Sequence, residues 1–307
     1  MHTLGIVRYT PADSADHFVQ LLHRILVEPR PVRRVTFGLK SPAAHPDEVL
    51  MHTVPRFILG VAGDHAQLHA DGAQARETPL LPHEAIFFPP LGWNRPRWKG
   101  PLEFFSAVFY PEYTRFVHGT SNGRARPRVI FHHTPAATTG ACAHLVSALV
   151  VASLRAAPTA GTCAMLDAVL WELRHALETS RGETVRRGRQ TWQAMAGYVQ
   201  ENLHRPLSLQ LLATHFRLHP NHVSRQFRRA GQENFVRYVT RLRMKRAELL
   251  LSEGNTDIER IALACGFTDV GYFRRVFCRF FGQSPAEWRD HPQRRSAGSS
   301  AARPRSA

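Results

Sequence analysis

A short apolar helix, a tight turn and a second helix with one apolar and one arginine-rich side are encoded twice in the last hundred or so residues of this chain. In the second copy, four apolar residues recur at i, i+3, i+4 and i+7: Phe273, Val276, Phe277 and Phe280. In the first copy, Val223 and Phe227 lie four residues apart, and Pro220 suits the first position of the helix. Helices with one buried stripe of this kind predict an all-α domain.

Turn and capping residues set the bounds of these helices. The first unit is predicted to contain a helix over 209–216 with Ser208 as its N-cap, a turn over 217–219 and a second helix from residue 220. The second unit repeats this design with helices over 258–265 and about 269–281 on either side of a tight turn at Gly266. The sequence therefore predicts two helix-turn-helix units.

A long helix over about 235–252 is predicted to join the two units, because apolar residues mark one packed side of it. Eighteen residues at ~1.5 Å each span roughly 27 Å. With the radius of the flanking units added, the second helices of the two units are expected about one turn of DNA apart, roughly 34 Å. Cations at Arg241, Arg243, Lys245 and Arg246 are expected mostly on the other faces of the long helix.

The charge of the chain is concentrated in this region. Residues 1–185 hold 18 Lys and Arg against 15 Asp and Glu, a net charge of +3. Residues 186–290 hold 18 against nine, a net charge of +9, and residues 291–307 add four Arg. A basic domain after a nearly neutral one indicates a polyanionic partner, although a generally arginine-rich composition would also give a basic chain.

Ten outward-facing residues are candidate DNA contacts. The first unit contributes Asn221, Ser224, Arg225, Arg228 and Arg229. The second unit contributes Gly271, Tyr272, Arg274, Arg275 and Arg279. A helix with this composition suits insertion into a DNA groove, because phosphates attract the cations and guanidinium groups can pair with guanine.

About residues 191–290 resemble the DNA-binding region of AraC/XylS-type transcription regulators. The resemblance rests on Ile261-Ala262, Gly266-Phe267-Thr268-Asp269, Tyr272-Phe273-Arg274-Arg275-Val276-Phe277, Gly282-Gln283-Ser284-Pro285 and Trp288-Arg289, and on the similar upstream series Leu207-Ser208, Leu212-Ala213, Ser224-Arg225, Phe227, Gly231, Phe235, Tyr238, Arg241-Leu242-Arg243 and Leu250-Leu251. It implies a sequence-specific regulator of double-stranded DNA that contacts RNA polymerase, and it favours activation.

The resemblance also assigns roles to the outward-facing residues. The base-facing positions would be Asn221, Ser224 and Arg225 in the first unit, and Gly271, Tyr272 and Arg275 in the second. We expect Arg228, Arg229, Arg274 and Arg279 to contact phosphates or to remain solvated.

Three residues depart from the family pattern or limit base reading. Arg217 stands where the first turn usually has glycine, and His219 where the next helix usually has a serine cap. If Arg217 adopts a positive φ, the strain is of order 1 kcal/mol. Gly271 offers no side chain to a base, so we expect reading by the second unit to depend on Tyr272 and Arg275.

Short apolar segments broken by Pro, Gly and His fill the first 138 residues and predict a β-sandwich or barrel. The predicted fold class is therefore α+β multidomain. The predicted divisions are a cupin-like sensor domain over 1–138, a helical hairpin over 139–180 that could cap the sandwich or form a homodimer, a linker over 181–190, the double helix-turn-helix domain over 191–290 and a disordered basic tail over 291–307.

Residues 83–93 resemble the turn segment of a cupin, which ends in Pro-x-Gly. A metal-binding cupin would place a histidine three residues after that glycine, where this chain has Arg95, and His65 and His69 do not complete a ligand set. We therefore expect neither a metal nor another cofactor. An unknown small-molecule effector would be lined or capped by Phe57, His69, Phe87, Trp93, Trp98 and Phe105.

Other functional classes find less support in the sequence. A cupin-type enzyme fused to a DNA-binding module is the main alternative, but it needs a metal triad that the sequence lacks; a ligand-free architectural protein is a third reading. No catalytic triad or phosphate-binding loop indicates an enzyme. The longest apolar run, near 145–154, is half a membrane span, and the four cysteines form no CxxC pair, so we expect a cytoplasmic protein without a membrane partner.

Overall fold

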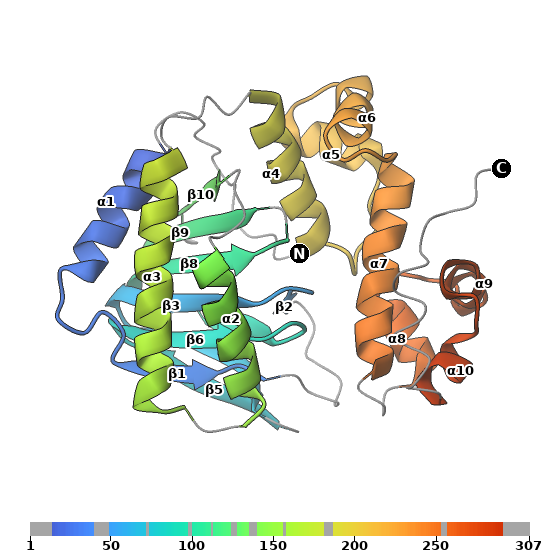
Figure 1. Cartoon of the computed structure of the whole chain (residues 1–307). Helices are drawn as coiled ribbons and strands as arrows, with labels where there is room; N and C mark the ends of the chain where they lie inside the picture. The colour runs from blue at the N-terminus through green and yellow to red at the C-terminus, as the bar shows by residue number, and fades with distance from the viewer. Residues whose placement is uncertain are drawn as a thin grey trace. The chain divides into compact units, whose positions relative to one another are not determined.

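A computed structural model describes residues 14–39, 49–71, 74–97, 100–111, 113–123, 128–134, 140–155, 158–180, 187–252 and 257–290 (Figure 1). The chain divides into two compact units, Met1–Gln190 and Thr191–Ala307. The first unit is built on two β-sheets and the second is entirely helical in its described part.

A six-stranded sheet forms the centre of the first unit, with strand order β1-β6-β3-β8-β9-β10. Its strands are β1 (Arg34–Phe37), β6 (Glu84–Phe88), β3 (Arg56–Gly63), β8 (Pro101–Phe109), β9 (Thr114–Asn122) and β10 (Arg128–Thr134). β1 pairs with β6 in parallel, and the other neighbours are antiparallel.

A second sheet has the order β2-β7-β4-β5 and faces the first. Its strands are β2 (Leu50–Met51), β7 (Trp93–Arg97), β4 (His65–Asp71) and β5 (Gln74–Leu80). Apolar residues of both sheets meet between them, among them Ile58, Ile86 and Phe88 from the first sheet and Leu80 from the second. The two sheets therefore form a sandwich with a shared core.

Three helices cover the other face of the six-stranded sheet: α1 (Ser14–Leu26), α2 (Gly140–Ser153) and α3 (Ala160–Ser180) (Figure 1). Their apolar sides join alternate residues of the strands in one large core. The helices α2 and α3 form the predicted hairpin. The helix α1 was not predicted, although Phe18, Leu22 and Ile25 of its buried side recur at helical spacing.

The second unit contains α4 (Arg187–Glu201) from Thr191 onward, followed by α5 (Leu209–Phe216), α6 (Pro220–Arg229), α7 (Phe235–Ser252), α8 (Ile258–Ala264), α9 (Val270–Phe281) and α10 (Pro285–Asp290). One core surrounds α5, α6 and the first half of α7, and a second core surrounds α8, α9, α10 and the second half of α7. The helix α7 thus carries one helix-turn-helix unit near each end (Figure 1).

The predicted fold class is confirmed: a β-rich two-sheet unit with a helical hairpin precedes an all-helical unit with two helix-turn-helix elements. The likeness of the sandwich to a cupin stays a prediction. The predicted linker over 181–190 needs a correction, because α4 begins at Arg187. Residues 181–186 and the predicted tail 291–307 lie outside the described residues.

Candidate nucleic-acid interface

The first helix-turn-helix unit is held by caps at both of its helices. The Ser208 hydroxyl accepts a hydrogen bond from the Leu211 backbone N–H at 3.1 Å, as predicted for an N-cap. At the start of α6, His219 Nδ1 accepts from the Asn221 backbone N–H at 3.2 Å. The imidazole therefore caps the helix in place of the usual serine, which the sequence pattern alone did not indicate.

The turn between α5 and α6 is strained at Arg217. This residue has φ 54° and ψ 44°, in the left-handed region that favours glycine. A residue with a Cβ atom loses of order 1 kcal/mol in this conformation. The Leu218 backbone N–H donates to the Ala213 carbonyl at 2.9 Å, and this bond helps to hold the turn.

The second helix-turn-helix unit has the turn and cap residues that are usual for such a motif. Gly266 makes the turn with φ 81°, and Asp269 caps α9 by accepting from the Tyr272 backbone N–H at 2.9 Å. Gly282 ends α9 with φ 77°. Phe273 and Phe277 are fully buried, whereas Val276 and Phe280 are only partly buried. The predicted apolar stripe is therefore present but narrower than expected.

The ten predicted DNA contacts lie on the accessible sides of α6 and α9. Ser224 is half-buried, and the other nine are exposed: Asn221, Arg225, Arg228, Arg229, Gly271, Tyr272, Arg274, Arg275 and Arg279. Within the described part of the chain, none of the six arginines in this set has an acidic partner, so their charges are available to an external anion.

Arg275 and Tyr272 form a pair that sequence reasoning missed. The Arg275 guanidinium carbon lies 5.9 Å from the centre of the Tyr272 ring, within reach of a cation–π interaction. The two residues are three apart on α9, so the pairing follows from helical spacing. A Cβ atom at Gly271 would lie 3.1 Å from Asp269 Oδ1 and 3.6 Å from an Arg275 nitrogen, so the glycine leaves room for both side chains.

Three cations of α7 are engaged within the protein, whereas Arg237 at its start is exposed. Arg241 donates to Glu233 at 2.6 Å, and Lys245 forms an ion pair with Glu248 at 2.8 Å. Arg243 donates to the backbone carbonyls of Leu203 at 3.1 Å and Arg205 at 2.8 Å.

Arg246 is only 2% exposed, and burial lowers the pKa of its guanidinium below the usual value. The expectation that α7 turns its cations to the other faces is therefore wrong for Arg246. The unengaged positive charge of the described unit is concentrated on α6 and α9 instead.

Comparisons with known proteins agree with this geometry. A family model described as a helix-turn-helix domain matches residues 212–291. The uncharacterized HTH-type transcriptional regulator YpdC of Escherichia coli K12 is 28% identical over 91% of this chain and 96% of its own length. The uncharacterized regulator YijO of the same organism is 25% identical over 88% of this chain and 92% of its own length.

The HTH-type transcriptional activator RhaS of Pectobacterium carotovorum is 34% identical over 33% of this chain and 36% of its own length. These similarities agree with the two helix-turn-helix units and with the motif residues found in the sequence. Residues 212–291 form a helix-turn-helix domain of the AraC/XylS type, and the chain is similar over most of its length to HTH-type transcriptional regulators.

Three of the predicted pocket residues face the helices rather than the second sheet. Phe57, Phe87 and Phe105 are fully buried in the core that α1, α2 and α3 form on the six-stranded sheet. Phe57 and Phe105 pack edge to face at 5.7 Å between ring centres. These residues therefore do not line the space between the two sheets, contrary to the prediction.

The other three pocket candidates lie in different places. His69 lies between the sheets, where its Nε2 is 2.8 Å from the Thr78 hydroxyl and its ring meets Phe88 edge to face. Trp93 precedes Asn94, the cross-strand partner of His69, and so points to the opposite face of the second sheet. Trp98 lies outside the described residues. His69 is thus the described candidate that faces the sandwich interior.

A buried polar chain crosses this interior and was not predicted. Arg56 donates to Asn94 Oδ1 at 2.6 Å, and the Asn94 amide donates to Gln67 Oε1 at 2.6 Å. The Arg56 guanidinium also lies 4.0 Å from the centre of the Phe88 ring. Among the described residues, no group of three or more His, Cys, Asp or Glu side chains is placed to hold a metal ion.

Within the described segments, no helix combines the length and the apolar character that crossing a bilayer requires.

Proposed function

We propose that this regulator binds specific double-stranded DNA by inserting α6 and α9 into two successive major grooves, with the ten residues named above as its contacts. The observation that carries the proposal is the pair of exposed arginine-rich helix faces without acidic partners in the described structure, one near each end of α7. Arg225 and Arg275 read bases, with Asn221, Ser224 and Tyr272 beside them. The remaining arginines bind phosphates.

The length of α7 supports reading of adjacent grooves. Its 18 residues span roughly 27 Å at ~1.5 Å each. The first core involves α7 up to Leu242 and the second begins at Met244, so both reading helices are fixed to the same rod. A spacing near the ~34 Å turn of B-form DNA then suits one face of the duplex.

Selection of binding sites from random DNA by the purified full-length protein tests the function. We expect two short motifs whose centres lie about 10 base pairs apart, and a binding constant that falls steeply with salt. Enrichment of a single motif, or of none, would contradict reading by both units. Binding of equal strength to every sequence would reduce the protein to a non-specific DNA binder.

Activation of transcription and control by an effector are finer parts of the proposal. A relative similar to the C-terminal third is named an activator, and activation in the cytoplasm would involve contact with RNA polymerase. The polar chain of Arg56, Asn94 and Gln67, together with His69, supports a small polar effector between the sheets. Transcription in vitro with purified RNA polymerase, from a promoter that carries the selected site, tests activation and effector control. The amount of transcript should rise when the regulator is added and should change when a metabolite fraction supplies an effector.

A homodimer through the helical hairpin completes the proposal. The helix α2 contains no Asp, Glu, Lys or Arg, and exposed apolar side chains lie on or next to the hairpin helices. Val151 is 52% exposed, Leu154 is 72% exposed and Trp171 on α3 is 52% exposed. Burial of these exposed apolar side chains against a second copy of the chain would favour association.

Sedimentation velocity of the full-length protein tests the dimer. We expect the wild type to sediment as a dimer at micromolar concentration and Leu154→Glu as a monomer, because the new charge would be buried at the interface. Val27→Glu changes another exposed apolar residue, away from α2, and should remain dimeric. A monomeric wild type, or a dimeric Leu154→Glu variant, would refute the hairpin interface.

A further inference from the structure

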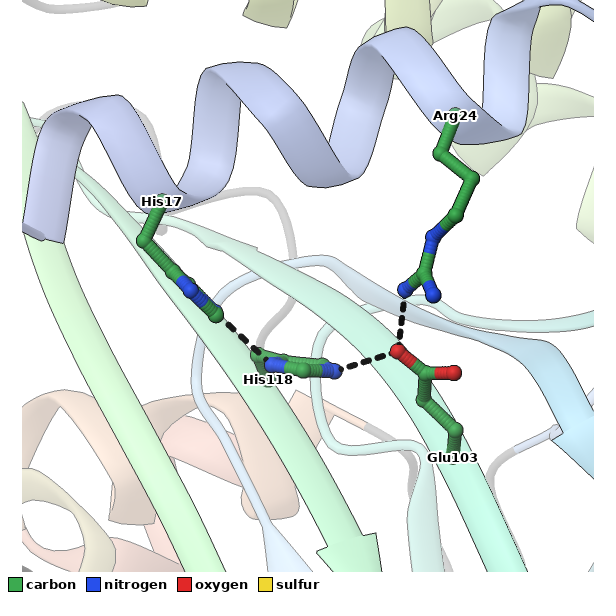
Figure 2. Close-up of polar contacts among 4 residues, drawn as sticks. All are labelled: His17, Arg24, Glu103 and His118. Carbon is green, nitrogen blue, oxygen red and sulfur yellow. Dashed lines mark hydrogen bonds and ion pairs between the residues drawn. The ribbon is translucent and has the colours of Figure 1, made fainter.

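Four polar side chains join α1 to the six-stranded sheet in one continuous chain of contacts (Figure 2). His17 Nε2 lies 2.8 Å from His118 Nδ1, and His118 Nε2 lies 2.8 Å from Glu103 Oε1. Arg24, two turns further along α1, donates to the same Glu103 oxygen. We name this set the α1 clasp; it begins and ends on α1 and passes through β9 and β8.

The chemistry of the clasp fixes where its protons lie. The Glu103 carboxylate can only accept, so His118 Nε2 carries a hydrogen and donates to it. His118 Nδ1 is then an acceptor when the imidazole is neutral, and His17 Nε2–H donates to it. With both imidazoles neutral, every contact in the clasp pairs one donor with one acceptor.

The clasp lies beside the apolar contacts that pack α1 against the six-stranded sheet. Phe18, next to His17, is fully buried and contacts Phe105 and Phe116 of the sheet. The His118 side chain is 7% exposed and Glu103 17% exposed, whereas the Arg24 side chain is 59% exposed. The histidine-to-histidine contact is therefore screened from water more than the arginine end.

Protonation acts on this arrangement in two steps. One added proton can be held between the rings. A doubly protonated His118 donates from Nε2 to Glu103 and from Nδ1 to His17 Nε2, when the neutral His17 carries its own hydrogen on Nδ1. A second proton places two N–H donors and two positive charges face to face at 2.8 Å. That state has no acceptor between the rings, so the contact between His17 and His118 is lost and the docking of α1 is weakened.

The surroundings of the clasp make the charged forms unfavourable. Burial lowers the pKa of His17, and Arg24 and Arg128 act in the same direction while Glu103 opposes them. Burial likewise lowers the pKa of His118, against its hydrogen bond to Glu103. His132 on β10 is a further titratable neighbour, with its ring centre 6.1 Å from that of Phe18 and 6.0 Å from that of Phe116.

We propose that the α1 clasp is an acid-sensitive latch, which holds α1 on the sheet at neutral pH and releases it when both His17 and His118 become protonated. The released state binds more protons than the docked state, so docking is strongest above the ordinary imidazole range near pH 6.5 and weakens as the pH falls below it. The N-terminal unit of the regulator would thereby respond to acidification through α1.

Hydrogen–deuterium exchange of the full-length protein tests the latch. Protection factors, corrected for intrinsic exchange, are measured at pH 7.5 and pH 5.5 for the peptide covering 14–26 and for β3 as an internal reference. We expect protection of α1 to fall about tenfold more than that of β3, the size that one lowered imidazole pKa produces over this interval.

Two variants separate the latch from general acid destabilisation. His118→Gln offers an amide that can donate to Glu103 and accept from His17 but cannot gain a charge, so protection of α1 should become nearly independent of pH. His132→Gln removes a half-buried histidine outside the clasp, whose pKa is lowered to about 4 by desolvation, and should keep the pH response. If His118→Gln does not fold, His17→Gln at a half-buried position tests the same contact.

The proposal is overturned if α1 and β3 lose protection equally in the wild type. It is also overturned if the clasp variants retain the full pH response, or if His132→Gln alone removes it.

Discussion

Replacing Gly266 by alanine is expected to lower the free energy of unfolding of the C-terminal unit by about 3 kcal/mol. Gly266 has φ 81°, and a side chain in this region costs about 1–2 kcal/mol. A methyl group there would also overlap the Leu203 carbonyl oxygen and lie 2.7 Å from an Arg243 nitrogen. Because Arg243 is itself bonded to the Leu203 and Arg205 carbonyls, neither neighbour can move away freely.

Urea unfolding followed by circular dichroism measures this loss, and Gly282→Ala provides a matched control. Gly282 has φ 77°, almost the same backbone conformation, but nothing lies within 4 Å of the position of an added methyl group. The control should therefore lose only the conformational part, about 1–2 kcal/mol. Equal losses in the two variants would show that the crowding around Gly266 does not matter.

Combining Arg225→Ala with Arg275→Ala is expected to weaken binding to the selected DNA site by about 2–6 kcal/mol. Each change alone should cost about 1–3 kcal/mol, because a bidentate contact with a base is lost. The residues lie in different units on α6 and α9, so their effects should add. Each single variant should also relax the base preference at one position of its own motif.

Fluorescence anisotropy on the selected site and on random DNA distinguishes base reading from charge. Arg241→Ala is the matched control, because Arg241 lies on α7 and is paired with Glu233 at 2.6 Å. It removes the same charge and should change affinity far less. If Arg225→Ala and Arg275→Ala reduce binding to random DNA as much as to the selected site, the two arginines contact phosphates and the base-reading assignment is wrong.

Much of the C-terminal unit was predictable from the sequence because its helices each bury one side only. The spacing of Val223 and Phe227, and of Phe273 and Phe277, identified the buried sides, and the remaining positions were then exposed by elimination. The cap at Ser208 also followed from local rules, whereas a left-handed conformation at Arg217 was considered only because the related family usually has glycine there.

The face of each strand was not predictable in the same way. The strands β3, β6 and β8 are apolar on both faces, since one face packs against helices and the other against the second sheet. A strand buried on both faces shows no alternation, so Phe57, Phe87 and Phe105 were assigned to the wrong side. The burial of Arg246 was missed for a similar reason, because two cores enclose α7.

The helix α1 was missed because it lies in a region dominated by short strands. Its apolar spacing was present in the sequence, but the surrounding segments of strand length favoured a sandwich without helices before residue 139. The clasp could not have been found, because it joins residues about 100 positions apart, His17 and His118. Contacts of this range depend on strand register, which no local pattern fixes.

Arg243 has a consequence for how the regulator would measure its target. Its guanidinium donates hydrogen bonds to the backbone just after α4. It also lies 5.4 Å from the centre of the Phe267 ring, in the second helix-turn-helix unit. The two halves of the DNA-binding unit are therefore locked in rotation as well as in distance. Inserting one base pair between the motifs turns one of them by about 35° around the duplex. A locked protein cannot follow that turn, so it would sense helical phase as strictly as base sequence.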